Sequence, residues 1–424
     1  MTPYLWFDTQ AEEAAHLYLS IFPESSLDKV NRPGGQVMMV EFSLAGQPFI
    51  ALNGGPMFSF NPSVSLYVVC ETEEEIQEMW EKLAEDGKVL MPLDAYAWSA
   101  KYGWVQDRYG LSWQLSLGKG AAGGQKISPA FLFAGEQRGK AETAIQQYTS
   151  LFPNSEIQDL SRYEAGDSDP AIGTLKHAEF TLKGMSFRAT DNSHDHGGSF
   201  NEAISFVIHC RNQAEVDHYW EQLSEGGEEM MCGWLKDRFG VVWQILPDEL
   251  IHLINDPDPE RAQRASGAMM RMRKIDIDTI HKAANGELPP IFSVQAMVMA
   301  PIWEVWEKWT QPEHIIHWNF ATDAWNAPAA TSDLQEGGAF SYRMEAKDGS
   351  MGFDFTGTFT TVQAPHRLGY RMEDGRQVEL LFSEAEGGTF VMQDIEAENQ
   401  APIERQQQGW QAIMNHFKRY VEGQ

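Results

Sequence analysis

The feature that most constrains this chain is a stretch of sequence that occurs twice. Residues 103–115 read GWVQDRYGLSWQL and residues 233–245 read GWLKDRFGVVWQI, so the two stretches lie 130 positions apart. Residues 21–30 (IFPESSLDKV) match residues 151–160 (LFPNSEIQDL) at the same separation. Because two distant matches share one offset, about the first 250 residues are predicted to be a tandem duplication of one structural unit.

Each copy shows a strand and helix pattern twice. An apolar run at residues 3–8 predicts a buried strand before a helix, and the run SVSLYVVC from Ser63 predicts the same order again. Thr9 with Glu12, and Thr72 with Glu75, have the spacing of a capping box at the start of each helix. Alternating apolar segments after each helix predict three more strands. Each copy is therefore expected to be a pair of βαβββ modules.

The first copy contains an insertion. Cys70 and Cys210 are 140 positions apart, whereas Gly103 and Gly233 are 130 apart, so the first copy has ten extra residues between these points. The insertion lies in the aromatic-rich stretch 89–102, VLMPLDAYAWSAKY. It predicts either a surface loop or a cover over a cleft.

The last third of the chain has its own pattern. A strand, a short helix with three tryptophans and several alternating segments precede a long amphipathic helix after Pro402. These elements predict a helix-grip fold, with a cavity between a curved antiparallel sheet and the closing helix. The fold class is therefore α+β. The expected domains are a first copy (1–118), a glycine-rich linker (119–126), a second copy (127–247), a helical extension (248–290) and a third domain (291–424).

Composition excludes several partners. The 61 acidic against 32 basic side chains give a formal net charge of −29, which repels nucleic acid and anionic membranes. Acidic residues at positions 8, 12 and 13 interrupt any signal peptide, and no run of about 18 apolar residues follows, so a cytoplasmic protein is predicted. The three cysteines form no CxxC pair and are expected to be reduced, with Cys70 and Cys210 in the core.

The duplicated part resembles the PhnB-like domains of the vicinal-oxygen-chelate superfamily, which includes glyoxalases and bleomycin-resistance proteins. The resemblance rests on SLYVVCETEEEIQEMWEKL, GWVQDRYGLSWQL and CGWLKDRFGVVWQILP, and it extends to about Ala284. It implies that the two domains pair within the chain as separate chains of the family pair in dimers, which suits a monomer or a homodimer. Relatives are often labelled demethylubiquinone methyltransferases, but this sequence shows no glycine-rich loop after a strand with an acidic residue to hold a nucleoside cofactor.

The resemblance also implies where a metal would bind. Metal-dependent members take His, Gln and Glu ligands from the first and last strands of each module, and the open-sided ion polarises substrate oxygens. Here the terminal Glu is replaced by Gln114 and Gln244. The opening strands offer only aromatic residues (Tyr4, Trp6, Phe131 and Phe133). The ligand set is incomplete, so a divalent metal is compatible with the chain but not favoured.

Candidate catalytic and metal-binding residues gather in the second copy. His177 and Glu179 are two apart on a predicted strand and therefore share a face, as a ligand pair, a polar cleft wall or a structural histidine would. The catalytic candidates are His177, Glu179 and Gln244, and the metal candidates are His177, Glu179 and His209. The HDH at positions 194–196 lies in a glycine-containing loop and predicts adventitious metal binding at most. The repeated Asp-Arg pair at 107–108 and 237–238 predicts a turn closed by Asp, or an acid with an anion clamp.

The third domain is similar to the AHSA family of START-like (SRPBCC) helix-grip proteins. The similarity rests on the spaced tryptophans and PEH of residues 300–318, on GGAF at 337–340 and on Gly409-Trp410. It implies a cavity for apolar ligands. The residues expected to line ligand sites are Trp318, Trp325, Tyr342, Arg343, Phe353, Phe355 and Gln393 here, and Trp104, Trp113, Gln114, Trp234 and Trp243 in the duplicated part, whose tryptophans would line either a core or a cleft for planar ligands.

Three functions remain open at this stage. The first is binding of a small apolar or aromatic molecule through metal-poor clefts and the helix-grip cavity. The second is a metal-dependent enzyme of glyoxalase or dioxygenase type in the second copy. The third is an interaction protein whose last domain stimulates a chaperone ATPase.

Overall fold

The computed structural model describes residues 1–119, 124–165, 167, 172–192, 198–385 and 387–423. The chain divides into two compact units, Met1–Asn285 and Gly286–Gln424. The HDH at positions 194–196 and residues 120–123 of the glycine-rich linker lie outside the described residues.

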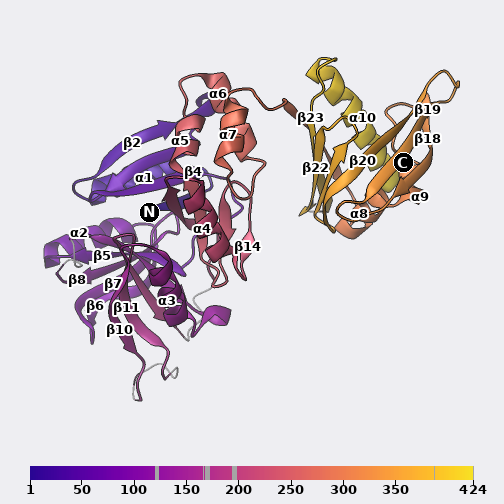
Figure 1. The fold of residues 1–424 in the computed structure, drawn as a ribbon. Helices are drawn as coiled ribbons and strands as arrows, with labels where there is room; N and C mark the ends of the chain where they lie inside the picture. Colours follow the sequence, from indigo (N-terminus) through magenta and orange to yellow (C-terminus); the bar gives the residue numbers. More distant parts are fainter. Residues whose placement is uncertain (120–123, 166, 168–171, 193–197, 386, 424) are drawn as a thin grey trace. The chain divides into compact units, whose positions relative to one another are not determined.

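Two eight-stranded sheets organise the first unit, and each takes strands from both copies (Figure 1). Sheet A has the order β14-β15-β16-β13-β1-β4-β3-β2 and sheet B the order β10-β11-β12-β9-β5-β8-β7-β6. The strands of sheet A are β1 (Thr2–Phe7), β2 (Ser26–Asn31), β3 (Met39–Leu44), β4 (Gln47–Asn53), β13 (Ile204–Cys210), β14 (Glu228–Glu229), β15 (Trp234–Lys236) and β16 (Val242–Pro247). The strands of sheet B are β5 (Val64–Cys70), β6 (Lys88–Tyr96), β7 (Ser99–Gln106), β8 (Ser112–Leu117), β9 (Ile127–Phe133), β10 (Glu156–Arg162), β11 (Leu175–Leu182) and β12 (Met185–Asp191).

The two copies are joined by backbone pairing in the middle of each sheet. In sheet A, β1 pairs antiparallel with β13 so that Tyr4 lies opposite Ser205. In sheet B, β5 pairs antiparallel with β9 so that Ser65 lies opposite Ala130. Each pairing covers the edge that an isolated module would leave open. The first module of one copy therefore completes its sheet with the last module of the other copy.

Four helices pack on these sheets: α1 (Ala11–Ile21), α2 (Glu73–Ala84), α3 (Ala141–Leu151) and α4 (Gln213–Ser224), and two short 3-10 helices lie at Pro33–Gly35 and Gly135–Gln137. The predicted cap at Thr72 is confirmed, because its side chain accepts a hydrogen bond from the Glu75 N–H at 3.1 Å. The predicted cap at Thr9 is wrong. The side chain of Asn53, at the end of β4, accepts the Ala11 N–H instead, at 2.8 Å. A partner distant in sequence has replaced the local cap.

The insertion of the first copy lengthens a hairpin. It extends β6 and β7, which pair antiparallel as far as Tyr96 and Ser99. The rings of Tyr96 and Trp98 stack at 5.0 Å, and that of Trp98 meets Tyr102 edge-on at 5.9 Å. The insertion is therefore regular sheet structure rather than a loop.

The helical extension contains α5 (Asp248–Ile254), α6 (Pro259–Met269) and α7 (Ile277–Ala284). Two of its basic residues have partners within the first unit. Arg264 donates to the Ala284 carbonyl oxygen at 2.7 Å, and Lys274 pairs with Asp217 of α4 at 2.7 Å. Within the described residues, no helix has the length and apolar character needed to cross a membrane.

The second unit is a seven-stranded antiparallel sheet, sheet C, with the order β17-β23-β22-β21-β20-β19-β18. The long helix α10 lies along it (Figure 1) and buries Met414, Phe417 and Val421. Phe417 packs on Trp309 and Trp318 at 4.5 and 4.9 Å. This is the predicted helix-grip arrangement. Its elements are β17 (Ile291–Val298), α8 (Ile302–Thr310), α9 (Pro312–Ile315), β18 (Trp325–Ser332), β19 (Ala339–Ala346), β20 (Gly352–Gln363), β21 (Arg367–Met372), β22 (Gln377–Ala385), β23 (Gly388–Glu396) and α10 (Ile403–Val421).

The repeated Asp-Arg turn holds a buried carboxylate. One oxygen of Asp107 accepts the N–H groups of Tyr109 and Leu111, at 2.9 and 3.1 Å. The other accepts the Tyr18 hydroxyl at 2.7 Å and the Trp113 indole N–H at 2.8 Å. The second copy repeats this network around Asp237, with Tyr148 and Trp243. The Asp closes the turn, as one of the two interpretations predicts, and it also binds a helix of the preceding module.

Removal of one buried hydroxyl from this network should be costly. We expect Tyr18→Phe to lower the free energy of unfolding of the first unit by about 1–3 kcal/mol, because a buried carboxylate loses a donor. Tyr109→Phe is the matched control, since its hydroxyl also donates to a carboxylate, that of Glu13, but at the surface. It should cost about 0.5 kcal/mol or less. Calorimetric melting of both variants tests this, and equal effects would contradict it.

Candidate functional site

One group of polar side chains lies on the face of sheet B away from its helices. Gln114 on β8 accepts the Tyr102 hydroxyl at 2.8 Å and donates to the Ser65 hydroxyl at 2.6 Å. Next to it, the Trp104 indole donates to Ser112 at 2.8 Å. Gln114, which stands at the terminal position of a metal-ligand set, is therefore held by protein partners on both its oxygen and its nitrogen.

A charged cluster from the second copy continues this face. Arg188 on β12 pairs with Glu179 on β11 at 2.5 Å, and its guanidinium lies 3.9 Å from the centre of the Tyr67 ring. His177 lies 3.6 Å from the same carboxylate. The nearby imidazole of His177 lowers the pKa of Glu179, with help from Arg188 and against the effect of burial. This carboxylate is therefore ionised and already balanced by a cation of the chain.

The remaining candidates of the second copy lie on sheet A. Gln244 on β16 donates to the Ser205 hydroxyl at 2.9 Å. His209 on β13 contacts the Thr2 hydroxyl at 3.1 Å and the Asp248 carboxylate at 3.4 Å. Its pKa is lowered first by burial and then by the chain's amino terminus. His177 and Glu179 therefore do not share a site with His209 and Gln244.

This separation corrects the expected gathering of candidates in one copy. Each sheet combines modules of both copies, so residues of the second copy are divided between two sheets. Within the described part of the chain, no three His, Cys, Asp or Glu side chains lie where they could hold one metal ion. The opening strand of the second copy also needs correction: Phe131 and Phe133 face the core, and Ala130 and Leu132 take the opposite face.

The four tryptophans of the repeated motif divide between two faces. Trp113 and Trp243 are fully buried in the core and donate to Asp107 and Asp237, so they are not available to a ligand. Trp104 lies on the opposite face in a small cluster with Tyr102 and Leu132. Its counterpart Trp234 meets the rings of Tyr4 and Trp6 edge-on at 5.6 and 6.4 Å.

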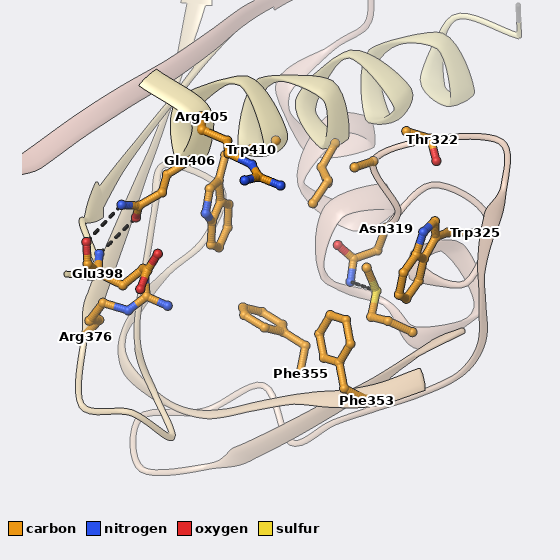
Figure 2. A pocket seen from close by; sticks show the side chains of 14 residues that line it. Asn319, Thr322, Trp325, Phe353, Phe355, Arg376, Glu398, Arg405, Gln406 and Trp410 are labelled. Carbon is orange, nitrogen blue, oxygen red and sulfur yellow. Dashed lines mark hydrogen bonds between the residues drawn. The ribbon is translucent and has the colours of Figure 1, made fainter. Parts of the chain in front are cut away.

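A cavity of about 450 Å³ lies in the second unit between sheet C and α10 (Figure 2). Phe353 and Phe355 rise from β20, and Trp410 projects from α10 toward them, with the rings of Phe355 and Trp410 5.9 Å apart. Trp325 lies on the side of Asn319 and Thr322, opposite a polar end formed by Arg376, Glu398, Arg405 and Gln406. The other lining residues are Ala321, Met344, Gly409 and Ile413.

Three of the seven residues expected to line this cavity do so: Trp325, Phe353 and Phe355. Trp318 packs in the core and donates to the Lys308 carbonyl oxygen at 2.9 Å. Tyr342 stacks on Phe340. Arg343 pairs with Glu345 and Asp354 at 2.8 and 3.5 Å, and Gln393 donates to the buried Tyr370 hydroxyl at 3.1 Å. The expected polar handles, Arg343 and Gln393, therefore lie elsewhere.

The closing helix α10 bounds the cavity as expected, but its residues were not among those predicted to line it. Gln406, Gly409, Trp410 and Ile413 line the cavity at the spacing of one helix face, which the 3.6-residue period could have revealed. Gly409 stands in the middle of this helix, and a Cβ built there meets no atom within 4 Å. The helix thus leaves open space where another residue would place a side chain.

Comparison with known proteins gives a family match for the duplicated part and another for the third domain. A family model described as 3-demethylubiquinone-9 3-methyltransferase matches residues 1–116 and 125–246, and a model described as Activator of Hsp90 ATPase homolog 1-like protein matches residues 299–422. The comparison with curated proteins found no match.

Solved structures similar to parts of the chain include an AHSA1-like protein from Aeromonas hydrophila. It is 46% identical over 32% of this chain and 93% of its own, with a TM-score of 0.31. A putative 3-demethylubiquinone-9 3-methyltransferase, PhnB protein, from Bacillus cereus is 43% identical over 28% of this chain and 98% of its own, with a TM-score of 0.27. Chr148 from Cytophaga hutchinsonii is 41% identical over 32% and 92%, with a TM-score of 0.28.

The environment of His209 predicts a pH dependence. Because its folded-state pKa lies below the unfolded value of 6.5, its contribution to stability is complete above that value and decreases as the pH falls through the folded-state pKa. When the pH is lowered from about 7.5 to about 5.5, we expect the melting temperature of His209→Gln to decrease less than that of the wild type. His16→Gln, at an exposed site on α1, should behave as the wild type. Parallel pH profiles for the wild type and His209→Gln would contradict this.

Proposed function

The chain belongs to the family described as 3-demethylubiquinone-9 3-methyltransferase, and we propose that it is a binding protein. In this proposal its third domain, residues 291–424, encloses a small apolar or aromatic molecule. The observation that carries the proposal is the cavity of about 450 Å³ bounded by Trp325, Phe353, Phe355 and Trp410. Its volume falls within the range of small-molecule sites, roughly 300–1,000 Å³, and aromatic walls with few polar groups are typical of such sites.

The helix that closes the cavity supports this proposal. Gly in the interior of a helix costs about 1 kcal/mol relative to Ala, so Gly409 weakens α10 where it faces the cavity. The open space at its Cα is what a bound molecule would fill. Phe353 also leaves 46% of its surface exposed, which ligand binding would reduce.

The methyltransferase of the family description is not what we propose. Its reaction requires a methyl donor, and the glycine-rich stretch after β8, residues 118–124, leads into strand β9 rather than into the helix that a nucleoside-binding loop opens. A metal-dependent reaction at His177 and Glu179 is also less well supported, because Arg188 already neutralises the carboxylate and Gln114 is bound by Tyr102 and Ser65.

Mass spectrometry of untagged, full-length protein tests binding directly. An organic mass present under native conditions and lost on denaturation would identify the ligand, and the native mass would also distinguish a monomer from a homodimer. Metal analysis of the same sample addresses the alternative: one divalent ion per chain that disappears in the His177→Ala, Glu179→Ala variant would favour catalysis in the duplicated part.

Partly filling the cavity should weaken binding without harming the fold. We expect Gly409→Leu to weaken binding of the fluorescent probe anilinonaphthalene sulfonate roughly tenfold, because the new side chain displaces about four probe atoms, each worth about 0.3 kcal/mol. The melting temperature should stay equal or rise, since a helical glycine is replaced. The measurement is a fluorescence titration of the full-length protein.

Gly409→Ala is the matched control for this titration. It gives the same gain in helix propensity but leaves most of the cavity open, so probe affinity should change little. If Gly409→Leu binds the probe as tightly as Gly409→Ala does, the probe lies elsewhere and the cavity is not the binding site.

A further inference from the structure

Resting on the proposed binding function, we infer that the cavity takes an amphipathic carboxylate, an aromatic or aliphatic body ending in a carboxylate group that pairs with Arg405. This assigns a chemical class to the ligand and a polar anchor to the site. The polar groups at one end of the cavity differ in whether they have hydrogen-bond partners within the protein.

Arg405 is the uncommitted cation of this end. It lies in the first turn of α10 and lines the cavity, in Figure 2 on the same side as Arg376, Glu398 and Gln406. Among the described residues, its guanidinium has neither a hydrogen-bond acceptor nor an ion-pair partner. Arg376, by contrast, pairs with Asp374 at 2.8 Å and donates to the Glu396 carbonyl oxygen at 3.2 Å.

Each of the other polar groups of this end has at least one partner in the protein. The Gln406 amide accepts from the Glu398 N–H and donates to the Glu398 carbonyl oxygen, both at 2.9 Å. The Glu398 carboxylate accepts the Gln400 N–H at 2.8 Å. Arg405 is therefore the group of this end whose side-chain donors have no acceptor among the described residues, and they are free to bind an acceptor supplied from outside the chain.

The acidic character of the chain bears on the role of Arg405. A protein of formal net charge −29 repels anions, so an anionic ligand needs a local cation to be retained. A guanidinium presents its donors in a planar fork that fits a carboxylate with two parallel hydrogen bonds. The positive end of the α10 dipole, at Ile403 to Arg405, acts in the same direction.

The geometry also orients the ligand. The apolar body would lie between Phe353, Phe355 and Trp410, and extend toward Trp325 on the side opposite the polar end. Glu398 provides the competing arrangement, in which a ligand ammonium group pairs with its carboxylate. Because both charges border one cavity, the sign of the ligand's head group can be tested with three molecules that share one body.

The experiment titrates full-length protein with naphthoate, with the neutral naphthamide and with naphthylmethylammonium, using calorimetry or tryptophan fluorescence. We expect naphthoate to bind at least about tenfold more tightly than naphthamide, as a charge-assisted hydrogen-bond pair predicts. In Arg405→Gln the preference should fall to about unity through loss of naphthoate affinity alone. Arg419→Gln, an exposed arginine near the other end of the same helix, is the control and should keep the preference.

The outcomes separate this inference from the proposed function. Equal binding of naphthoate and naphthamide, or an unchanged preference in Arg405→Gln, overturns the inference while leaving cavity binding intact. Tighter binding of naphthylmethylammonium overturns it in favour of Glu398. Failure of all three to bind, together with no effect of Gly409→Leu on the fluorescent probe, overturns both.

Discussion

The first unit depends on two buried carboxylates. Asp107 lies in the turn between β7 and β8 of sheet B, and it accepts the hydroxyl of Tyr18 from α1, a helix of the module whose strands lie in sheet A. Asp237 makes the reciprocal connection to Tyr148 on α3. Removing a carboxylate from water is costly unless every lone pair finds a donor, and four donors surround each Asp. Burial nonetheless raises the pKa of both, because the hydrogen bonds offset the loss of hydration only in part.

This geometry explains why one copy of the repeat does not correspond to one site. The sheets exchange modules between copies, so the polar face of sheet B combines Gln114 of the first copy with Arg188 of the second. Ile50 of β4 in sheet A and Arg188 of β12 in sheet B hold equivalent positions in the two copies, because each directly follows a matching phenylalanine, Phe49 or Phe187, and pairs with the opening strand of its copy. The duplication therefore kept the scaffold and allowed the two faces to acquire different chemistry.

In the second unit the cavity follows from where aromatic side chains point. The helix α10 buries Met414 and Phe417 against the sheet core, while Trp410 and Gly409, a turn earlier, face the cavity. The same helix therefore stabilises the fold at its carboxyl half and shapes a binding site at its amino half. Arg405 adds a charge at the first turn, where a long side chain can reach the cavity and still remain hydrated.

The sequence by itself determined the local structure: the duplication, the βαβββ modules, the helix-grip elements and the cap at Thr72, because periodicity and capping act over a few residues. It also placed Trp325, Phe353 and Phe355 at the cavity. Only the tertiary structure decided that Asn53 caps α1, that His177 and His209 lie on different sheets, and that Arg405 rather than Arg343 reaches the cavity. These depend on which elements meet in the folded chain, and local patterns do not specify contacts between residues that are distant in sequence.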